Sequence, residues 1–205
     1  MSENMNLWRN VCITDPSAVK SITGKQYKGN SPKPYWLIEQ ATKVFGPCGI
    51  GWGINVVSER FERFGDTESL HIAQVKVWYM LDGKRGEIEQ MGQTRSSYVT
   101  SSGKFTVDED APKKSVTDGM VKCLSMLGFA GDIFSGRWDD SRYVEFAGNH
   151  HAAAEQIAAI ESAKTIDLLK SHFAAAWKMS DDKMRPAIKT AYDTRLQQLT
   201  PKEPA

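Results

Sequence analysis

The clearest pattern in the chain is an alternation of apolar and polar residues between Leu70 and Leu81. Such a period of two residues predicts a β-strand with one buried face. The apolar side carries Ala73, Val75, Val77, Tyr79 and Leu81, and the other side carries Gln74, Lys76 and Trp78. Asp82-Gly83 follows and is typical of a type I′ turn, so a second strand should return from Lys84 to about Arg95. Residues 53–64 also have strand character, which predicts an antiparallel meander with one buried face.

Helical periodicity appears on both sides of this meander. Before it, an apolar stripe of Leu37, Ala41, Val44 and Phe45 predicts a short helix that Gly46 and Pro47 end. After it, residues 97–110 are typical of a loop or an irregular strand.

A longer helix is then predicted from about Ala111 to Leu127, with its apolar stripe at Val116, Met120, Cys123, Leu124 and Leu127. Asp110 is placed to act as the N-cap, Pro112 to occupy the first turn, and Gly128 to end the helix. Glycine inside a helix costs about 1 kcal/mol relative to alanine, so Gly119 should permit a close approach to a neighbouring element.

From Asn149 onward the composition favours helices throughout. Thr165 and Ser180 are candidate N-caps, and a stripe of Ile166, Leu169, Phe173 and Trp177 should face Ile188, Tyr192 and Leu196 on the next helix. We therefore predict an α+β protein in which residues 1–148 form an antiparallel meander packed on helices. Residues 149–205 should form a C-terminal helical appendage that either packs on the core or binds a partner.

Composition excludes several classes of protein. The 205 residues have a formal net charge of +1, and no apolar stretch approaches the roughly 18 residues that a membrane span needs. The first residues lack the pattern of a secretory signal. Cys12, Cys48 and Cys123 are too few and too scattered for a disulfide framework. These features predict a protein of the cytoplasm that is not bound to a membrane.

The balanced total charge conceals a basic segment. Residues 16–38 contain no acidic side chain and carry Lys20, Lys25, Lys28 and Lys33 among glycine, serine and proline residues. Tyr27, Tyr35 and Trp36 are interleaved with these lysines, and Lys113, Lys114 and Lys122 lie on the polar face of the longer predicted helix. Lysines that neutralise phosphates beside aromatic rings that stack on bases are typical of single-strand binders.

A catalytic site is not predicted from the residues. The chain lacks the GxxxxGK[ST] pattern of a P-loop, and the adjacent His150 and His151 cannot both face one metal ion from a helix. The acidic run of residues 108–110 leaves two alternatives, a Mg²⁺ site of a nuclease or an acidic helix N-terminus favoured by the helix dipole. We favour the second alternative and expect no cofactor.

A longer motif adds a family resemblance. The run KKSVTDGMVKCLSMLGFAGDIF, from Lys113 to Phe134, resembles the signature helix of single-strand annealing proteins related to eukaryotic Rad-fifty-two, a superfamily that includes phage Sak-type recombinases. The helix of residues 35–45, followed by a glycine-rich turn and Gly51-Trp52, is similar to the family's earlier helix and first strand. The resemblance covers roughly residues 19–144.

The resemblance implies a ring of subunits that holds single-stranded DNA in a basic groove and anneals complementary strands in homologous recombination and repair without ATP. Lys122 matches one of two adjacent basic residues that follow the Asp-Gly of the signature. Val121 stands at the other position, and Ser125 stands at a third basic position of the family helix. Lys113 matches a lysine before the signature, and Lys20 with Lys25 or Lys28 matches basic residues before the first helix.

Further functions remain open at the level of sequence. One alternative is a passive module that coats single strands without annealing them, and another is a metal-dependent nuclease that uses Asp108, Glu109 or Asp110. The resemblance implies a bacterial host cytoplasm if the protein is encoded by a phage. The C-terminal helices, which lie outside the resemblance, are candidates to bind a single-strand-binding protein or an exonuclease.

Overall fold

The computed structural model describes residues 3–23, 28–180, 182 and 184–200. Lys25 and Tyr27 of the basic segment lie outside these described residues. The chain divides into two compact units, Met1–Asp139 and Asp140–Ala205. Composition predicts a boundary after Gly148, whereas Gly148 lies inside a helix that begins at Ser141. The structural division therefore precedes that whole helix.

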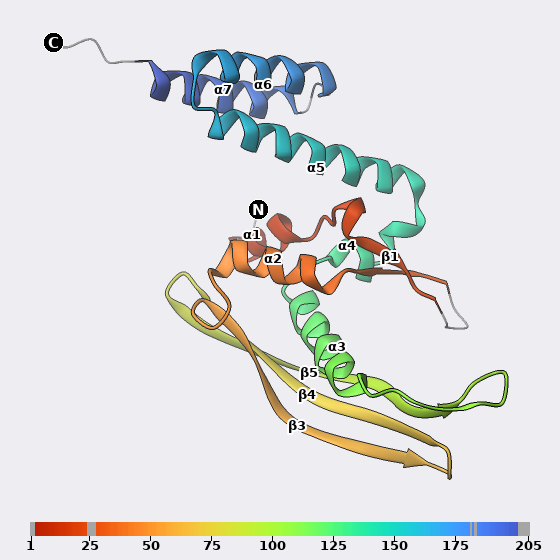
Figure 1. Ribbon diagram of the computed structural model, residues 1–205. Coiled ribbons are helices and arrows are strands. Elements are labelled where there is room, and N and C mark those ends of the chain that lie inside the picture. Colours follow the sequence, from red (N-terminus) through yellow and green to blue (C-terminus); the bar gives the residue numbers. More distant parts are fainter. Residues whose placement is uncertain (1–2, 24–27, 181, 183, 201–205) are drawn as a thin grey trace. The chain divides into compact units, whose positions relative to one another are not determined.

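The first unit contains a curled antiparallel sheet with the strand order β3–β4–β5–β6 (Figure 1). Its strands are β3 (Trp52–Phe64), β4 (Glu68–Leu81), β5 (Lys84–Val99) and β6 (Phe105–Val107). Asp82 and Gly83 join β4 to β5 with φ angles of 50° and 73°, as a type I′ turn requires. Ala73, Val75 and Val77 are completely buried. These observations confirm the predicted α+β class and the meander with one buried face.

Helix α3 (Ala111–Met126) lies across the buried face of β4 and β5 (Figure 1). Two glycines allow the close approach: a Cβ atom on Gly119 would lie 2.6 Å from Val75 Cγ2, and one on Gly92 would lie 1.9 Å from the Ser115 carbonyl oxygen. Both positions exclude a side chain at this spacing. The thiol of Cys123 donates to the carbonyl oxygens of Val75 and Ile88, at 3.4 Å each. The expected role of Gly119 is therefore confirmed.

The ends of α3 agree only in part with those predicted from the sequence. Gly128 follows the helix with φ of 101°, which confirms the predicted stop. Asp110 occupies the N-cap position, but its side chain makes no capping hydrogen bond, so that prediction is wrong. Its carboxylate instead accepts a hydrogen bond from Lys113 Nζ at 2.9 Å. Residues 97–110, expected to form a loop or an irregular strand, contain the end of β5, the short strand β6 and loops at residues 100–104 and 108–110, which agrees with the expectation.

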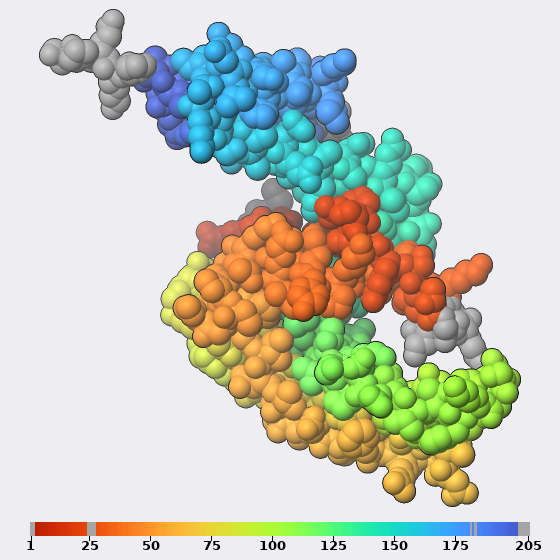
Figure 2. Space-filling view, viewed as in Figure 1, coloured from red at the N-terminus to blue at the C-terminus, as the bar shows by residue number. Residues whose placement is uncertain are grey.

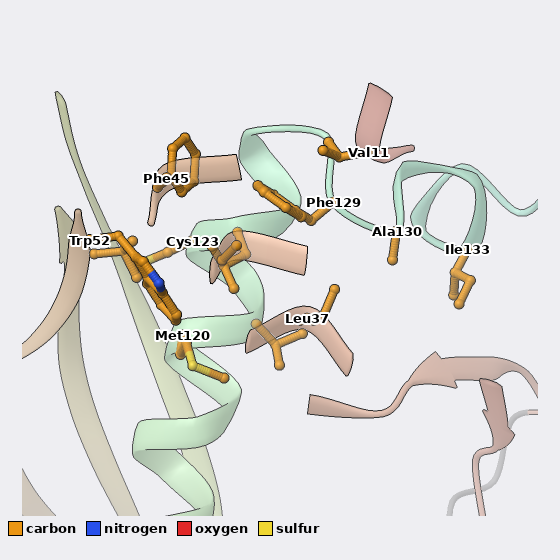
Figure 3. Close-up of a cluster of buried hydrophobic side chains, with 13 residues drawn as sticks. Val11, Leu37, Phe45, Trp52, Met120, Cys123, Phe129, Ala130 and Ile133 are labelled. Carbon is orange, nitrogen blue, oxygen red and sulfur yellow. The ribbon is translucent and has the colours of Figure 1, made fainter. Parts of the chain in front are cut away.

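Helix α2 (Pro34–Phe45) packs with α3 over the same core through Leu37, Ala41 and Phe45. Val44, the fourth residue of the predicted stripe, is instead 36% exposed. Figure 3 shows Leu37, Trp52 and Phe129 reaching into this core from three separate segments of the chain. Each of these three side chains is completely buried. Helices α2 and α3 and the sheet therefore pack around one shared apolar core, which holds them rigidly relative to one another.

The N-terminal segment packs on the loop that follows α3. It comprises a 3₁₀ turn (Glu3–Met5), α1 (Asn6–Val11), a second 3₁₀ turn (Pro16–Ala18) and the antiparallel ribbon of β1 (Val19–Ser21) and β2 (Asn30–Pro32). The buried carboxylate of Asp132 in α4 (Gly131–Phe134) accepts from the backbone amide of Thr14 at 2.8 Å and from its hydroxyl at 2.6 Å. Trp138, in the 3₁₀ turn Arg137–Asp139, donates its indole N–H to the same carboxylate at 2.9 Å. Asp132 therefore fixes the start of the ribbon segment to the core.

The second unit consists of α5 (Ser141–Ser162), α6 (Ile166–Met179) and α7 (Arg185–Leu199) around a core of their own. Leu169 and Ile188 are completely buried there, and the rings of Phe173 and Tyr192 lie 4.4 Å apart. The facing stripes of α6 and α7 are therefore confirmed except at Trp177, which is 36% exposed although its ring lies 5.3 Å from that of Phe173. Thr165 caps α6 by accepting from the Leu168 amide. Ser180 follows the end of α6 rather than starting α7, so its predicted N-cap role is wrong.

Among the helices of the described residues, none combines the length and the hydropathy that crossing a bilayer requires.

Candidate nucleic-acid interface

An open groove of about 450 Å³ lies between the β1–β2 ribbon and α3. We call it the lysine groove, and among the described residues it is lined by Lys20, Ser31, Pro32, Pro34, Asp110, Lys113, Lys114, Thr117, Asp118 and Val121. Figure 2 shows a notch between the red-orange ribbon segment and the green surface of α3 and the β5–β6 hairpin. Lys20 approaches from one wall and Lys113 with Lys114 from the other, so lysines that are distant in sequence converge on one surface.

The local fold explains why these side chains face the groove. Helix α3 buries Ser115, Gly119 and Cys123 against the sheet, so Lys114 and Thr117 lie on a different side of the helix. On the opposite wall, Lys20 pairs with Ser31 across the ribbon. The backbone amide of Lys33 donates to the Ala18 carbonyl at 2.7 Å and closes the base of the ribbon.

Both helix lysines of the groove form ion pairs with acidic side chains. Lys114 Nζ lies 2.6 Å from Asp108 Oδ2, and Lys113 Nζ lies 2.9 Å from Asp110 Oδ1. The hydrogen bond that Lys114 donates to Asp108 is the main cause that raises the pKa of Lys114, and Tyr98 adds a smaller contribution in the same direction. The hydrogen bond to Asp110 raises the pKa of Lys113, and the same bond lowers the pKa of Asp110. Both lysines and Asp110 therefore stay charged at neutral pH.

The Lys113–Asp110 pair is exchangeable because it is open to solvent. The Lys113 and Asp110 side chains are 83% and 60% exposed, and such pairs contribute little to stability, so a phosphate that enters the groove can replace Asp110 at low cost. In the other pair Lys114 is 54% exposed and Asp108 is 20% exposed, so a phosphate reaches this pair from the lysine side. The pairs also engage two of the three carboxylates proposed for a nuclease. Within the described part of the chain, no cluster of three or more potential metal-ligating side chains was found.

The remaining predicted lysines that the structure describes lie outside the lining of the lysine groove. Lys122 is exposed on α3 directly after Val121, and its ammonium lies 4.9 Å from the centroid of the Phe134 ring. Lys33 donates to the Ser17 carbonyl oxygen at 2.8 Å and lines a separate hollow beside Tyr35, which is 84% exposed. Lys28 is exposed near the ribbon. Lys25 belongs to residues that the structure does not describe.

The aromatic residues of the basic segment separate into different environments. Trp36 is half-buried, packing against the apolar core while also lining the hollow beside Lys33 and Tyr35. Tyr35 at the start of α2 presents its ring to solvent. Trp78, on β4, lies 4.6 Å under the guanidinium of Arg85.

A second hollow of about 560 Å³ lies at the β5 end of the lysine groove. We call it the Tyr98 hollow, and among the described residues it is lined by Thr23, Leu70, Gln93, Thr94, Arg95, Tyr98 and Asp108. Two contacts join it to the lysine groove: Lys114 with Asp108, and the Gln93 amide with Asp118 Oδ2 at 3.2 Å. Sequence reasoning missed Arg95 and Tyr98 because they fall where a regular strand was expected to end.

Comparisons with known proteins give no match: neither a protein-family model nor a curated protein matches the chain.

Proposed function

We propose that this protein binds single-stranded DNA in the lysine groove and anneals complementary strands without ATP, as an oligomer acting in homologous recombination and repair. The observation that carries the proposal is the convergence of Lys20 with Lys113 and Lys114 on one open groove. The ribbon and the helix bring these cations together although they are far apart in the sequence. Single strands bind largely through phosphate neutralisation, which releases counterions.

The groove also suits a strand whose bases must remain available for pairing. It is open to solvent, and its lining combines lysines with the small polar side chains of Ser31 and Thr117. Such groups contact phosphates and sugars without reading a sequence. Beyond Val121, at one limit of the lining, Lys122 continues the basic track along α3. We therefore expect Lys122→Ala to reduce annealing as well, in agreement with the family resemblance.

Association of subunits is supported by the two outer strands of the sheet. On β3, the exposed fractions of Val56, Val57, Phe61 and Phe64 range from 47% to 62%, and on β6 Phe105 and Val107 are 53% and 61% exposed. β3 and β6 lie at opposite ends of the strand order. An outer strand with apolar side chains is suited to pair with another chain. Joining β3 of one subunit to β6 of the next is a head-to-tail contact, which closes into a ring when the rotation permits.

A ring would raise the affinity for a long strand without new contacts. The few lysines of one groove give weak binding, but successive grooves on one strand act at a high effective concentration. The alternative of a passive coating module shares the groove and differs only in the absence of annealing. The nuclease alternative requires Asp108 and Asp110 to exchange their lysine partners for a metal ion.

The second unit is proposed to recruit a protein partner, such as a single-strand-binding protein or an exonuclease, in the bacterial cytoplasm of a phage-infected host. It has a complete core of its own, and Phe146 and Met179 are 51% and 71% exposed beside a hollow of about 150 Å³. Apolar side chains of a partner are suited to such a surface.

An annealing assay tests the function directly. Two complementary labelled oligonucleotides are mixed with the protein, with and without Mg²⁺ and in the absence of nucleotide, and the products are separated on a gel. We expect duplex to form faster than in the protein-free reaction. Retarded but unpaired strands would instead support the passive module, and shortened strands that appear only with Mg²⁺ would support the nuclease.

A matched pair of variants links the activity to the groove. Lys114 and Lys43 are both exposed helix lysines, each 2.6 Å from a carboxylate oxygen. Lys114→Gln should slow annealing, whereas Lys43→Gln on α2 should not. Equal annealing rates for the two variants would refute the assignment of DNA binding to the lysine groove. Light scattering that finds only a monomer, with and without DNA, would refute the ring.

A further inference from the structure

The Tyr98 hollow differs from the lysine groove in the chemistry of its walls. Arg95 lies over the Tyr98 ring, with the guanidinium carbon 5.9 Å from the ring centroid. Gln93, Thr94 and Thr23 add neutral hydrogen-bonding groups, and Leu70 adds an apolar one. A planar guanidinium above an aromatic ring, within a polar hollow, is a surface on which another flat ring can stack.

The position of the hollow relates it to the path of a nucleic-acid backbone. Asp108 lines the hollow and also holds Lys114, which lines the lysine groove. The two spaces are therefore adjacent, and a phosphate that displaces Asp108 from Lys114 lies next to the hollow. Each nucleotide carries its base beside its phosphate, so one base of a bound strand comes within reach of Tyr98 and Arg95.

We propose that the Tyr98 hollow is a nucleobase-binding subsite, in which one unpaired base for each subunit stacks against Arg95 and Tyr98 while its phosphate binds Lys114. This inference rests on the proposed binding of single-stranded DNA in the lysine groove. Stacking uses the face that all bases share, so the subsite accepts any base and preserves the sequence tolerance that annealing requires. A base held here is withdrawn from pairing, and its release accompanies the pairing of the complementary strand.

Strands that differ only in their bases separate this inference from the proposed function. The two probes are an oligothymidylate and a strand of the same length built from abasic tetrahydrofuran units, which carry the same phosphates. Affinities are measured by fluorescence anisotropy at fixed salt. We expect the oligothymidylate to bind about 5- to 10-fold more tightly, and Tyr98→Ala to abolish this preference while leaving binding of the abasic strand unchanged.

Two controls exclude general effects of the substitutions. Tyr98→Phe retains the ring and should keep the preference for bases. Arg85 provides a match for Arg95, because both are exposed β5 arginines over an aromatic ring. Arg95→Gln should weaken binding of oligothymidylate more than binding of the abasic strand, whereas Arg85→Gln should affect neither.

Each outcome bears on one of the two proposals. If neither strand binds, the proposed function fails. If both strands bind equally well, or if Tyr98→Ala retains the full preference for oligothymidylate, DNA binding stands and the base subsite is refuted. Circular dichroism of each variant, compared with the parent protein, shows whether a loss of binding comes from unfolding.

Discussion

Replacing Lys20 with glutamine should change the salt dependence of single-strand binding by a predictable amount. Lys20 projects into the lysine groove from the ribbon, and it makes no salt bridge among the described residues. Lys20→Gln therefore removes one cation without leaving a carboxylate unpaired. Lys113 and Lys114 remain on the opposite wall, so the groove retains two of the three lysines that line it in the described structure.

The magnitude follows from counterion release. Each phosphate contact with a single strand contributes a slope of about −0.7 to the plot of log K against log salt concentration, so three lysines give about −2.1 for each subunit. Two lysines give about −1.4, and between about 50 and 200 mM salt the loss of affinity falls from roughly 18-fold to roughly 7-fold. Lys122, which lies outside the groove, contributes equally to both slopes, so the expected change is a loss of about 0.7 for each subunit on the strand.

Fluorescence anisotropy of a labelled oligonucleotide across a salt series measures both slopes. Lys84→Gln is the matched control, because Lys84 is also an exposed strand lysine but lies at the β4–β5 turn. Its slope should equal that of the parent protein. The reasoning is refuted if Lys20→Gln keeps the parent slope, or if Lys84→Gln lowers it by the same amount.

Two further substitutions test the packing and hydrogen bonds that position the walls of the groove, and a third tests the charge beside Lys114. Asp132→Ala should lower the free energy of unfolding by about 3–5 kcal/mol, because the Thr14 amide and the Trp138 indole lose their buried acceptor; chemical denaturation measures this, and a loss under about 1 kcal/mol would contradict it. Gly92→Ala should cost about 3 kcal/mol because its Cβ would meet the Ser115 carbonyl oxygen at 1.9 Å, whereas Gly29→Ala, with its nearest contact at 3.5 Å, should cost less than about 0.5 kcal/mol in the same measurement. Asp108→Asn should tighten single-strand binding about 2- to 5-fold in anisotropy titrations, because Lys114 loses its competing charge; unchanged or weaker binding would show that Lys114 does not contact the strand.

Where hydrophobic period and turn chemistry agree, the sequence predicts the elements well. The alternation along β4, the Asp82-Gly83 turn and the stripe of α2 apart from Val44 appear in the structure as expected. These signals are local, because a strand or a helix repeats its buried face at a fixed period. The contact of Gly119 with Val75 was also predictable, since a glycine inside a helix has a cost that close packing explains.

Two predictions that depended on the hydrogen bond of a single side chain were wrong. Asp110 and Ser180 are both suitable N-cap residues, yet neither caps a helix. Asp110 pairs with Lys113 instead, and the hydroxyl of Ser180 donates to the Trp177 carbonyl oxygen at 3.1 Å. A polar side chain has several partners within reach, and the sequence does not rank them.

The candidate site likewise combines features that a local stretch of sequence indicates with features that depend on contacts between distant segments. Lysines suited to phosphate binding, in an acid-free segment and on the polar face of a helix, are evident from the sequence. Which of these lysines share a groove is not evident from the sequence. Lys20, Lys113 and Lys114 line one groove, whereas Lys33 and Lys122 lie outside its lining. Arg95 and Tyr98 gave no periodic signal, and only the packing of the ribbon segment near β5 places Thr23 beside them.

The sequence by itself determined the class of the fold, most of the elements, and the kinds of side chain that can meet a phosphate. The tertiary structure alone decided which cations share a groove, that acidic partners occupy two of them, and that an arginine and a tyrosine lie at its end. The physical reason is the range of the interactions. Backbone geometry and hydrophobic period act over a few neighbouring residues, whereas a binding surface is assembled by packing segments that are distant along the chain.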